Sequence, residues 1–315
     1  MSGVLKLAQK FNCFYLSGLK SCDYKPFVVE GFQVGLVRPD VMKQLLKYPE
    51  VFHVNSGCVE LNPAFRDYKE RSNEIDKVLR KLRAENVFIA LKGWRDEFYE
   101  VKTQFNSQSL LKMDRSATCL FGIRNYGVDI NGYIKHPVKG LCLWFQKRSP
   151  TKQTWPGKWD HMVGGGLSVG HGILETAHKE AMEEASVSPH LLKDLISAGC
   201  VSGGIFPNTE FVFDLELPVD FVPVNADGEV ETFELLSAEQ SIERILSPDF
   251  KTTSAPITLD FLIRHGVITP ENEEHFLEIV ELLHVPLQSI YERYAPLNSN
   301  NSVKENGIPP AVRNS

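Results

Sequence analysis

Apolar residues follow two spacings in the first part of the chain, and each spacing predicts a different kind of element. Short apolar stretches between residues 25 and 37, separated by glycines, indicate strands. From Pro39 to Tyr48 the apolar side chains recur at helical spacing, and residues 62–83 carry one apolar stripe among charged residues. The pattern predicts a separate N-terminal α/β domain over residues 1–115.

From about residue 116 the pattern changes to compact apolar runs divided by turns. Strands are expected at four places, residues 117–123, 141–146, 211–217 and 231–236. Helices are expected at four others, residues 174–185, 238–246, 260–264 and 271–283. The mixture predicts a second α/β domain over residues 116–290. Residues 291–315 are predicted to form a polar tail.

Composition narrows the class of protein. Hydrophobic residues make up 43% and charged residues 23%, which suits a globular protein with a sizeable core. The net charge of −6 argues against a protein that coats nucleic acid, and no run of about 18 apolar residues predicts a membrane span. The six cysteines are scattered and are expected to be reduced thiols, which points to the cytoplasm. A mitochondrial leader is less expected, because no arginine precedes Arg38.

Candidate chemistry is concentrated between residues 164 and 187. Three consecutive glycines, Gly164–Gly166, could form a turn with positive φ that approaches a ligand closely. Glu180, Glu183 and Glu184 follow on the predicted helix, and their spacing places all three carboxylates on one face. Such a face suits Mg²⁺ or Mn²⁺, although most glutamate-rich helix faces are only solvated surface and most glycine runs are ordinary loops.

The same segment resembles the Nudix box, G-x5-E-x7-R-E-U-x-E-E-x-G-U, where U is a bulky aliphatic residue. Gly165 falls on the first glycine, and Glu180, Glu183 and Glu184 fall on the last three glutamates. The resemblance implies a Nudix-type α/β/α sandwich and a hydrolase acting on phosphoric anhydrides, with the three glutamates as ligands of Mg²⁺ or Mn²⁺. Glu183 and Glu184 are then also the candidate catalytic groups.

Some positions depart from that pattern. Lys179 stands where arginine is usual, Ala181 replaces the aliphatic residue and Ser186 replaces the last glycine. His171 occupies the place of the early glutamate, whose usual partner is the arginine. Both members of this orienting pair have changed, and Glu175 is a candidate to compensate. His171→Glu is expected to be tolerated.

The departures and three further segments make the chain similar to the Nudix proteins related to the N-terminal part of fungal thiamine pyrophosphokinase fusion proteins. The segments are LKGWRDE at residues 91–97, WPGKWD at 155–160 and DFLIRHG at 260–266. The resemblance implies release of phosphate from thiamine diphosphate or its oxidised or damaged analogues, which gives the monophosphate. Alternatives are a nucleoside or sugar-nucleotide diphosphate as substrate, or a catalytically inactive Nudix fold that serves as a binding module.

Other residues are candidates for substrate contact or for catalysis. Glu231, with Glu229 as a second choice, is the late acidic residue expected to assist, unless both belong only to a solvated turn. Lys158 is expected to reach a phosphate. Trp155 could stack on a ring, whereas Trp159 is expected to be buried. Arg95 could cover the substrate from the first domain, with Trp94 placed between the domains by packing. His265 and Cys200 are given no catalytic role.

Overall fold

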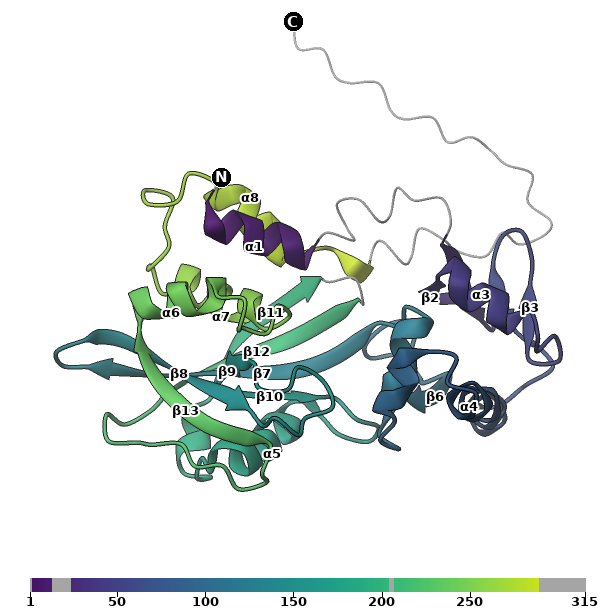
Figure 1. The fold of residues 1–315 in the computed structure, drawn as a ribbon, viewed down its shortest axis with the longest axis horizontal. Helices are drawn as coiled ribbons and strands as arrows, with labels where there is room; N and C mark the ends of the chain where they lie inside the picture. The colour runs from purple at the N-terminus through teal and green to yellow at the C-terminus, as the bar shows by residue number, and fades with distance from the viewer. Residues whose placement is uncertain (1, 13–23, 204–206, 289–315) are drawn as a thin grey trace, which may run out of the picture.

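The computed structural model describes residues 2–12, 24–203 and 207–288, which form two units lying side by side (Figure 1). Cys13, Cys22 and the predicted polar tail lie outside the described residues. No helix in these ranges is long and apolar enough to cross a membrane. The four cysteines they contain are free thiols.

The first unit is built on a four-stranded sheet of order β2-β1-β4-β3, in which β1 runs parallel to β4 and antiparallel to β2. Its strands are β1 (Lys25–Val29), β2 (Phe32–Val37), β3 (Phe52–Val54) and β4 (Val59–Leu61). Its other elements are α3 (Pro39–Leu45), α4 (Tyr68–Ala84), η2 (Ile89–Gly93), the hairpin β5 (Phe98–Val101) and β6 (Leu111–Asp114), and η3 (Arg115–Leu120). The apolar stripe of α4, including Ile75 and Leu79, is buried in one core with the sheet.

The second unit is built on a seven-stranded mixed sheet whose main order is β11-β12-β7-β8-β13, with β10 paired to β7 and β9 to β8. The strands are β7 (Asn125–His136), β8 (Gly140–Arg148), β9 (Trp159–His161), β10 (Val163–Gly166), β11 (Ile196–Gly203), β12 (Asn208–Glu216) and β13 (Val230–Ser237). The helices are α5 (Ile173–Ala185), η4 (Leu191–Asp194), α6 (Ala238–Leu246), α7 (Ala255–Arg264) and α8 (Phe276–Leu283).

Helices cover both faces of this sheet, which gives the α/β/α sandwich expected from the sequence (Figure 1). On one face Ala177, Ala181 and Ala185 of α5 pack on strand residues such as Val128 and Ile130. On the other face α6, α7 and α8 enclose a second core. The small alanine side chains let α5 approach the sheet closely, so that its glutamates lie beside β10.

The first helix does not follow the expected division at residue 115. Helix α1 (Gly3–Phe11) packs against α7 and α8 of the second unit, where Leu5 and Ala8 are fully buried. Conversely, residues after 115 remain in the core of the first unit as far as Ile123. A truncated chain that begins at residue 116 would therefore lack one helix of the second core.

The strand expected at residues 117–123 is wrong. These residues begin in the 3₁₀ helix η3, which Asp114 caps by accepting a hydrogen bond from the Ser116 N–H at 2.9 Å. The apolar run arises because Ala117, Leu120 and Phe121 all enter the first core, and a short buried run has the same pattern in a strand or a helix. Helix α8 is also shorter than expected, because it begins at Phe276.

Candidate active site

The three glycines of the candidate motif form a strand and not a turn. Residues 163–166 are extended and pair with β7 across its residues 127–130, so the expected positive φ is wrong. A Cβ atom at Gly165 would collide with the side chain of Glu180, and one at Gly166 would collide with the hydroxyl of Tyr99. Glycine is required here because side chains press on both faces of the strand. It also brings Glu180 against the backbone of β10.

The start of α5 is braced differently from the family pattern. Glu175 accepts a hydrogen bond from the backbone N–H of Gly172 at 3.2 Å, as in a capping box. His171 lies beside the same carboxylate, with Nδ1 3.3 Å from Oε1 of Glu175. Lys179 is paired with Glu180 at 3.3 Å and Glu183 at 2.9 Å. Glu175 thus braces the helix start, and restoring a glutamate at 171 would not create the expected pair toward Lys179.

The end of α5 explains the serine that replaces the last glycine of the box. Ser186 adopts the left-handed conformation with φ 52°, which glycine tolerates most easily. Its hydroxyl donates a hydrogen bond to the Val224 carbonyl at 2.7 Å. This contact ties the C-terminal end of the helix to the segment that leads into β13.

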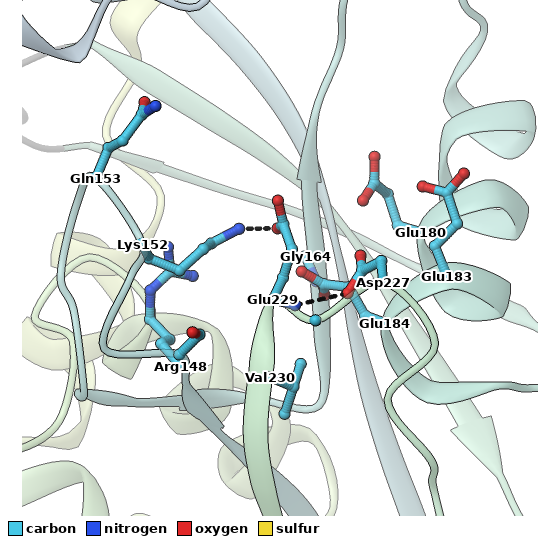
Figure 2. Close-up of polar contacts among 12 residues, drawn as sticks. Arg148, Lys152, Gln153, Gly164, Glu180, Glu183, Glu184, Asp227, Glu229 and Val230 are labelled. Carbon is cyan, nitrogen blue, oxygen red and sulfur yellow. Dashed lines mark hydrogen bonds and ion pairs between the residues drawn. The ribbon is translucent and has the colours of Figure 1, made fainter.

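The three glutamates of α5 occupy different environments (Figure 2). Glu183 is exposed, and Glu180 is half-buried beside Gly165. Glu184 is 2% exposed, and its Oε2 accepts hydrogen bonds from the Gly164 N–H at 3.0 Å and the Gln146 amide at 3.2 Å. The carboxylates therefore extend from solvent to the edge of the sheet, along one face of the helix.

Burial disfavours the ionised forms of two carboxylates on this acidic face, even though Lys179 lies beside it. Burial raises the pKa of Glu184 to about 7, although the hydrogen bond from Gly164 opposes the rise. Burial also raises the pKa of Glu180 above its ordinary value, against the opposing effect of Lys179. A cation placed among these carboxylates would favour their ionised forms.

Two cations that the sequence did not single out, Lys152 and Arg148, lie across from the acidic face (Figure 2). Lys152 and Arg148 come from β8 and the loop that follows it, and Figure 2 shows Lys152 reaching toward the acidic groups across from α5. Burial lowers the pKa of Lys152 to about 8, with Glu184 opposing that shift and Arg148, Arg95 and Arg115 adding to it. The site thus presents carboxylates on one side and clustered cations on the other.

The late acidic residues nearest to α5 are Asp227 and Glu229. Backbone N–H groups of Val224 and Ala226 donate to carbonyls of Ala185 and Glu183, which places Asp227 beside the helix (Figure 2). Glu229 forms an ion pair with Lys152. Glu231, the first choice from the sequence, is exposed on β13 and pairs with Lys147 at 3.1 Å. Adjacent side chains of a strand point to opposite faces, so Glu231 points to solvent where its neighbour Val230 points into the core.

Other candidate substrate contacts are dispersed. Lys158 contacts the Pro248 carbonyl at 3.1 Å and Asp249 at 3.4 Å, away from the acidic face. Trp94 is buried in the core of the first unit, so it does not pack between the units. Trp159 packs beneath Arg244, whose guanidinium lies 4.1 Å from the ring centroid. Trp155 is 39% exposed on the loop that carries Lys152, and it remains available for contact.

A second carboxylate cluster lies behind β10 and is already neutralised. Asp160 is almost fully buried, and its Oδ2 lies 3.1 Å from Arg148 and 2.8 Å from Lys251. The ring of His161 lies between Asp160, at 3.1 Å, and Asp129, at 2.7 Å. Burial opposes ionisation of Asp160, but Lys251, His161 and Arg148 outweigh it and hold its pKa well below the ordinary value. This cluster is a buried ion network.

The donor set on α5 fits a divalent cation. Carboxylate oxygens are the ligands preferred by Mg²⁺ and Mn²⁺, and burial raises the pKa values of two of these carboxyls, a shift that a bound cation would oppose. Among the described residues, no three His, Cys, Asp or Glu side chains already converge on one point. Glu180 and Glu183 would have to turn away from Lys179 to share a metal.

Comparisons with known proteins identify both units. Residues 134–261 match the NUDIX domain, and residues 3–125 match a domain of unknown function, DUF4743. Nudix hydrolase 24, chloroplastic, of Arabidopsis thaliana is 35% identical over 259 residues, which cover 79% of this chain and 70% of the relative. Nudix hydrolase 20, chloroplastic, of the same plant is 34% identical over 280 residues, with coverage of 84% and 74%.

Two solved structures share weaker similarity. DR0079 from Deinococcus radiodurans is 21% identical with a TM-score of 0.40, over 54% of this chain and 98% of that one. The NUDIX domain of Shewanella oneidensis NrtR, complexed with ADP ribose, is 10% identical with a TM-score of 0.37, over 46% and 89%. The two plant relatives, matched over most of their length, assign the family: this chain belongs to the Nudix hydrolases and is a hydrolase acting on phosphoric anhydrides.

Proposed function

We propose that the chain removes the terminal phosphate of thiamine diphosphate, or of its oxidised or damaged analogues, and leaves the monophosphate. The hydrolytic part rests on the acidic face of α5 opposite Lys152 and Arg148. The thiamine part rests on the sequence resemblance carried by residues 91–97, 155–160 and 260–266.

Glu180, Glu183 and Glu184 would hold Mg²⁺ or Mn²⁺. When bound, the cation would neutralise the diphosphate and lower the pKa of an attacking water. Glu184 is fixed by Gly164 and Gln146, so it is the ligand whose position is already set. Asp227 and Glu229 replace Glu231 as the acidic groups best placed to orient water or metal.

A pocket beside the loop before α5 supports recognition of a flat ring. Both units line it, with Tyr99 and Phe105 from the first and Tyr126 and Leu167 from the second. The rings of Phe105 and Tyr126 meet edge to face at 4.8 Å. Aromatic faces favour a planar cationic ring by stacking and cation–π contact, each worth about 0.5–2 kcal/mol.

The test is hydrolysis of a panel of diphosphates in the presence of Mg²⁺, with the products separated by chromatography, because ADP-ribose would give two monophosphates and no free phosphate. The panel contains thiamine diphosphate, an oxidised analogue, ADP-ribose and an oxidised guanine nucleotide. We expect kcat/KM for a thiamine compound to exceed that for the nucleotides by at least about tenfold. Preference for a nucleotide over every thiamine compound would overturn the substrate while leaving the acidic face as the catalytic centre. Absence of turnover on every member would favour the inactive binding module.

A further inference from the structure

Arg95 is an arginine of the first unit whose side chain contacts the second unit. Its guanidinium is half-buried, and its Nε donates to the side-chain amide of Gln153 on the loop after β8. By contrast, Arg38 is paired with Asp40, and Arg115 with Glu97. Over residues 2–12, 24–203 and 207–288, Arg95 forms no ion pair within 4.0 Å of a carboxylate. The first unit thus presents to the second an arginine that, among the described residues, has no carboxylate within ion-pair distance.

The loop that meets Arg95 is held in place by another cation. Arg148 donates to the carbonyls of Thr154 at 3.1 Å and Trp155 at 3.2 Å, which fixes residues 149–158 over the end of β8. Lys152 projects from this loop and pairs with Glu229. The loop therefore carries both Lys152, which points toward the acidic groups, and Gln153, which contacts the guanidinium of Arg95 (Figure 2).

The cations are close enough to repel one another. Burial lowers the pKa of Arg95, and the charges of Arg115 and Arg148 lower it further, whereas the charge of Glu97 opposes the shift. Clustered like charges are unfavourable unless an anion occupies the space between them. A guanidinium forms two parallel hydrogen bonds to phosphate oxygens, and a lysine adds a point charge. The cluster therefore suits a phosphate group.

We propose that Arg95 of the N-terminal unit and Lys152 of the β8–β9 loop together bind the terminal phosphate of a diphosphate that is esterified at one end only. The inference rests on the proposed hydrolytic site, which supplies the acidic face opposite these cations. A terminal phosphate is more negative than a bridging one and offers three oxygens to donors. The first unit thereby distinguishes one-ended diphosphates from those esterified at both ends.

The first experiment is calorimetric titration of the full chain with inorganic pyrophosphate in the absence of metal. We expect Arg95→Ala to weaken binding by about tenfold, the scale of a hydrogen bond to a charged group. Arg95→Lys, which keeps the charge but loses the fork, should fall between Arg95→Ala and the parent. Arg38→Ala is the matched control on the same unit and should bind as the parent does. Equal affinity in the parent and in Arg95→Ala, or no binding by the parent, would overturn the proposal.

The second experiment compares thiamine diphosphate with ADP-ribose in the same variants, with circular dichroism to verify folding. The ratio of their kcat/KM values should fall by about tenfold in Arg95→Ala, because the one-ended substrate loses a contact that the other lacks. An unchanged ratio would contradict the terminal-phosphate assignment. If the parent binds pyrophosphate through Arg95 but hydrolyses neither compound, the phosphate site stands and the proposed function fails.

Discussion

Two carboxylate clusters, one on each side of β10, have opposite electrostatic properties. On α5, burial raises the pKa of Glu180 and Glu184, and the nearest cation, Lys179, is exposed. Behind the strand, Asp160 is equally buried but contacts Arg148, Lys251 and His161. The cations of the second cluster outweigh its burial, whereas Lys179 does not outweigh burial in the first. This difference supports the proposal that α5 binds the metal and that Asp160 has a structural role.

The largest expected effect is on stability, and it comes from a substitution that breaks the second cluster. Asp160→Asn leaves the buried Arg148 and His161 and the partly buried Lys251 without their shared carboxylate. The free energy of unfolding should fall by about 3–5 kcal/mol, as measured by denaturant titration. Asp249→Asn, which removes an exposed partner of Lys158, should change stability by less than about 1 kcal/mol. Equal stability of the two variants would mean that the buried network contributes nothing.

Glu184→Gln should lower activity strongly without lowering stability, which is the reverse of the expectation for Asp160→Asn. Loss of one anionic ligand is expected to lower kcat by at least about 100-fold, roughly 2.7 kcal/mol. Stability should stay at or above that of the parent, because glutamine can still accept from Gly164 and carries no buried charge. Steady-state kinetics at saturating Mg²⁺, with a thermal melt of the same sample, separates the two effects. Turnover close to normal would place the active site elsewhere.

The periodicity of α5 made one half of the site predictable. Helical spacing and the family pattern placed Glu180, Glu183 and Glu184 on one face, and the structure agrees that they share it. The cations were not predictable in the same way, because Arg148 and Lys152 lie outside the motif and approach α5 only when the second unit folds, and Arg115 comes from the first unit. The choice among the late acids depends on tertiary contacts: the segment before β13 is bonded to the backbone of α5 through Val224 and Ala226, and the sequence does not show this.

In the fold, too, helix positions were predictable from local spacing, whereas tertiary contacts were not. Local spacing predicted α5 and α6 to within about two residues. It could not show that α1 crosses to the second unit, because an amphipathic helix does not identify the surface that covers it. Nor could it show that the three glycines form a strand. They are glycines because the side chains of Glu180 and Tyr99 lie against them, and these are tertiary contacts.

His171→Glu tests the start of α5 with a smaller expected effect. The side chain is exposed and contacts Glu175, so the variant places two acidic groups together near a helix N-terminus that favours negative charge. Activity should remain within about tenfold of the parent, less than about 1.4 kcal/mol. The measurement is kcat/KM with thiamine diphosphate. Complete loss of activity with the fold intact would make His171 a direct participant.

The smallest expected effect is on the pH dependence of stability, and it comes from the buried carboxyl of Glu210 on β12. Burial, and then the charge of Asp129, raises its pKa to about 8. Below about pH 8 the folded protein keeps a proton on Glu210, whereas the unfolded chain loses it at the ordinary, lower pKa of a glutamate. The free energy of unfolding therefore falls as the pH rises toward 8. Glu210→Gln should remove that dependence, and its advantage in Tm over the parent should grow from about pH 6 to 9. A constant difference in Tm across this range would count against the raised pKa.

The most direct test of the contrast between the clusters is Mn²⁺ binding followed by electron paramagnetic resonance, without substrate. The parent should bind Mn²⁺, and Glu184→Gln should bind it at least about tenfold more weakly, about 1.4 kcal/mol. Glu281→Gln, which changes an exposed glutamate on α8, should match the parent. Equal Mn²⁺ affinity in the parent and in Glu184→Gln would contradict the assignment of the metal to α5.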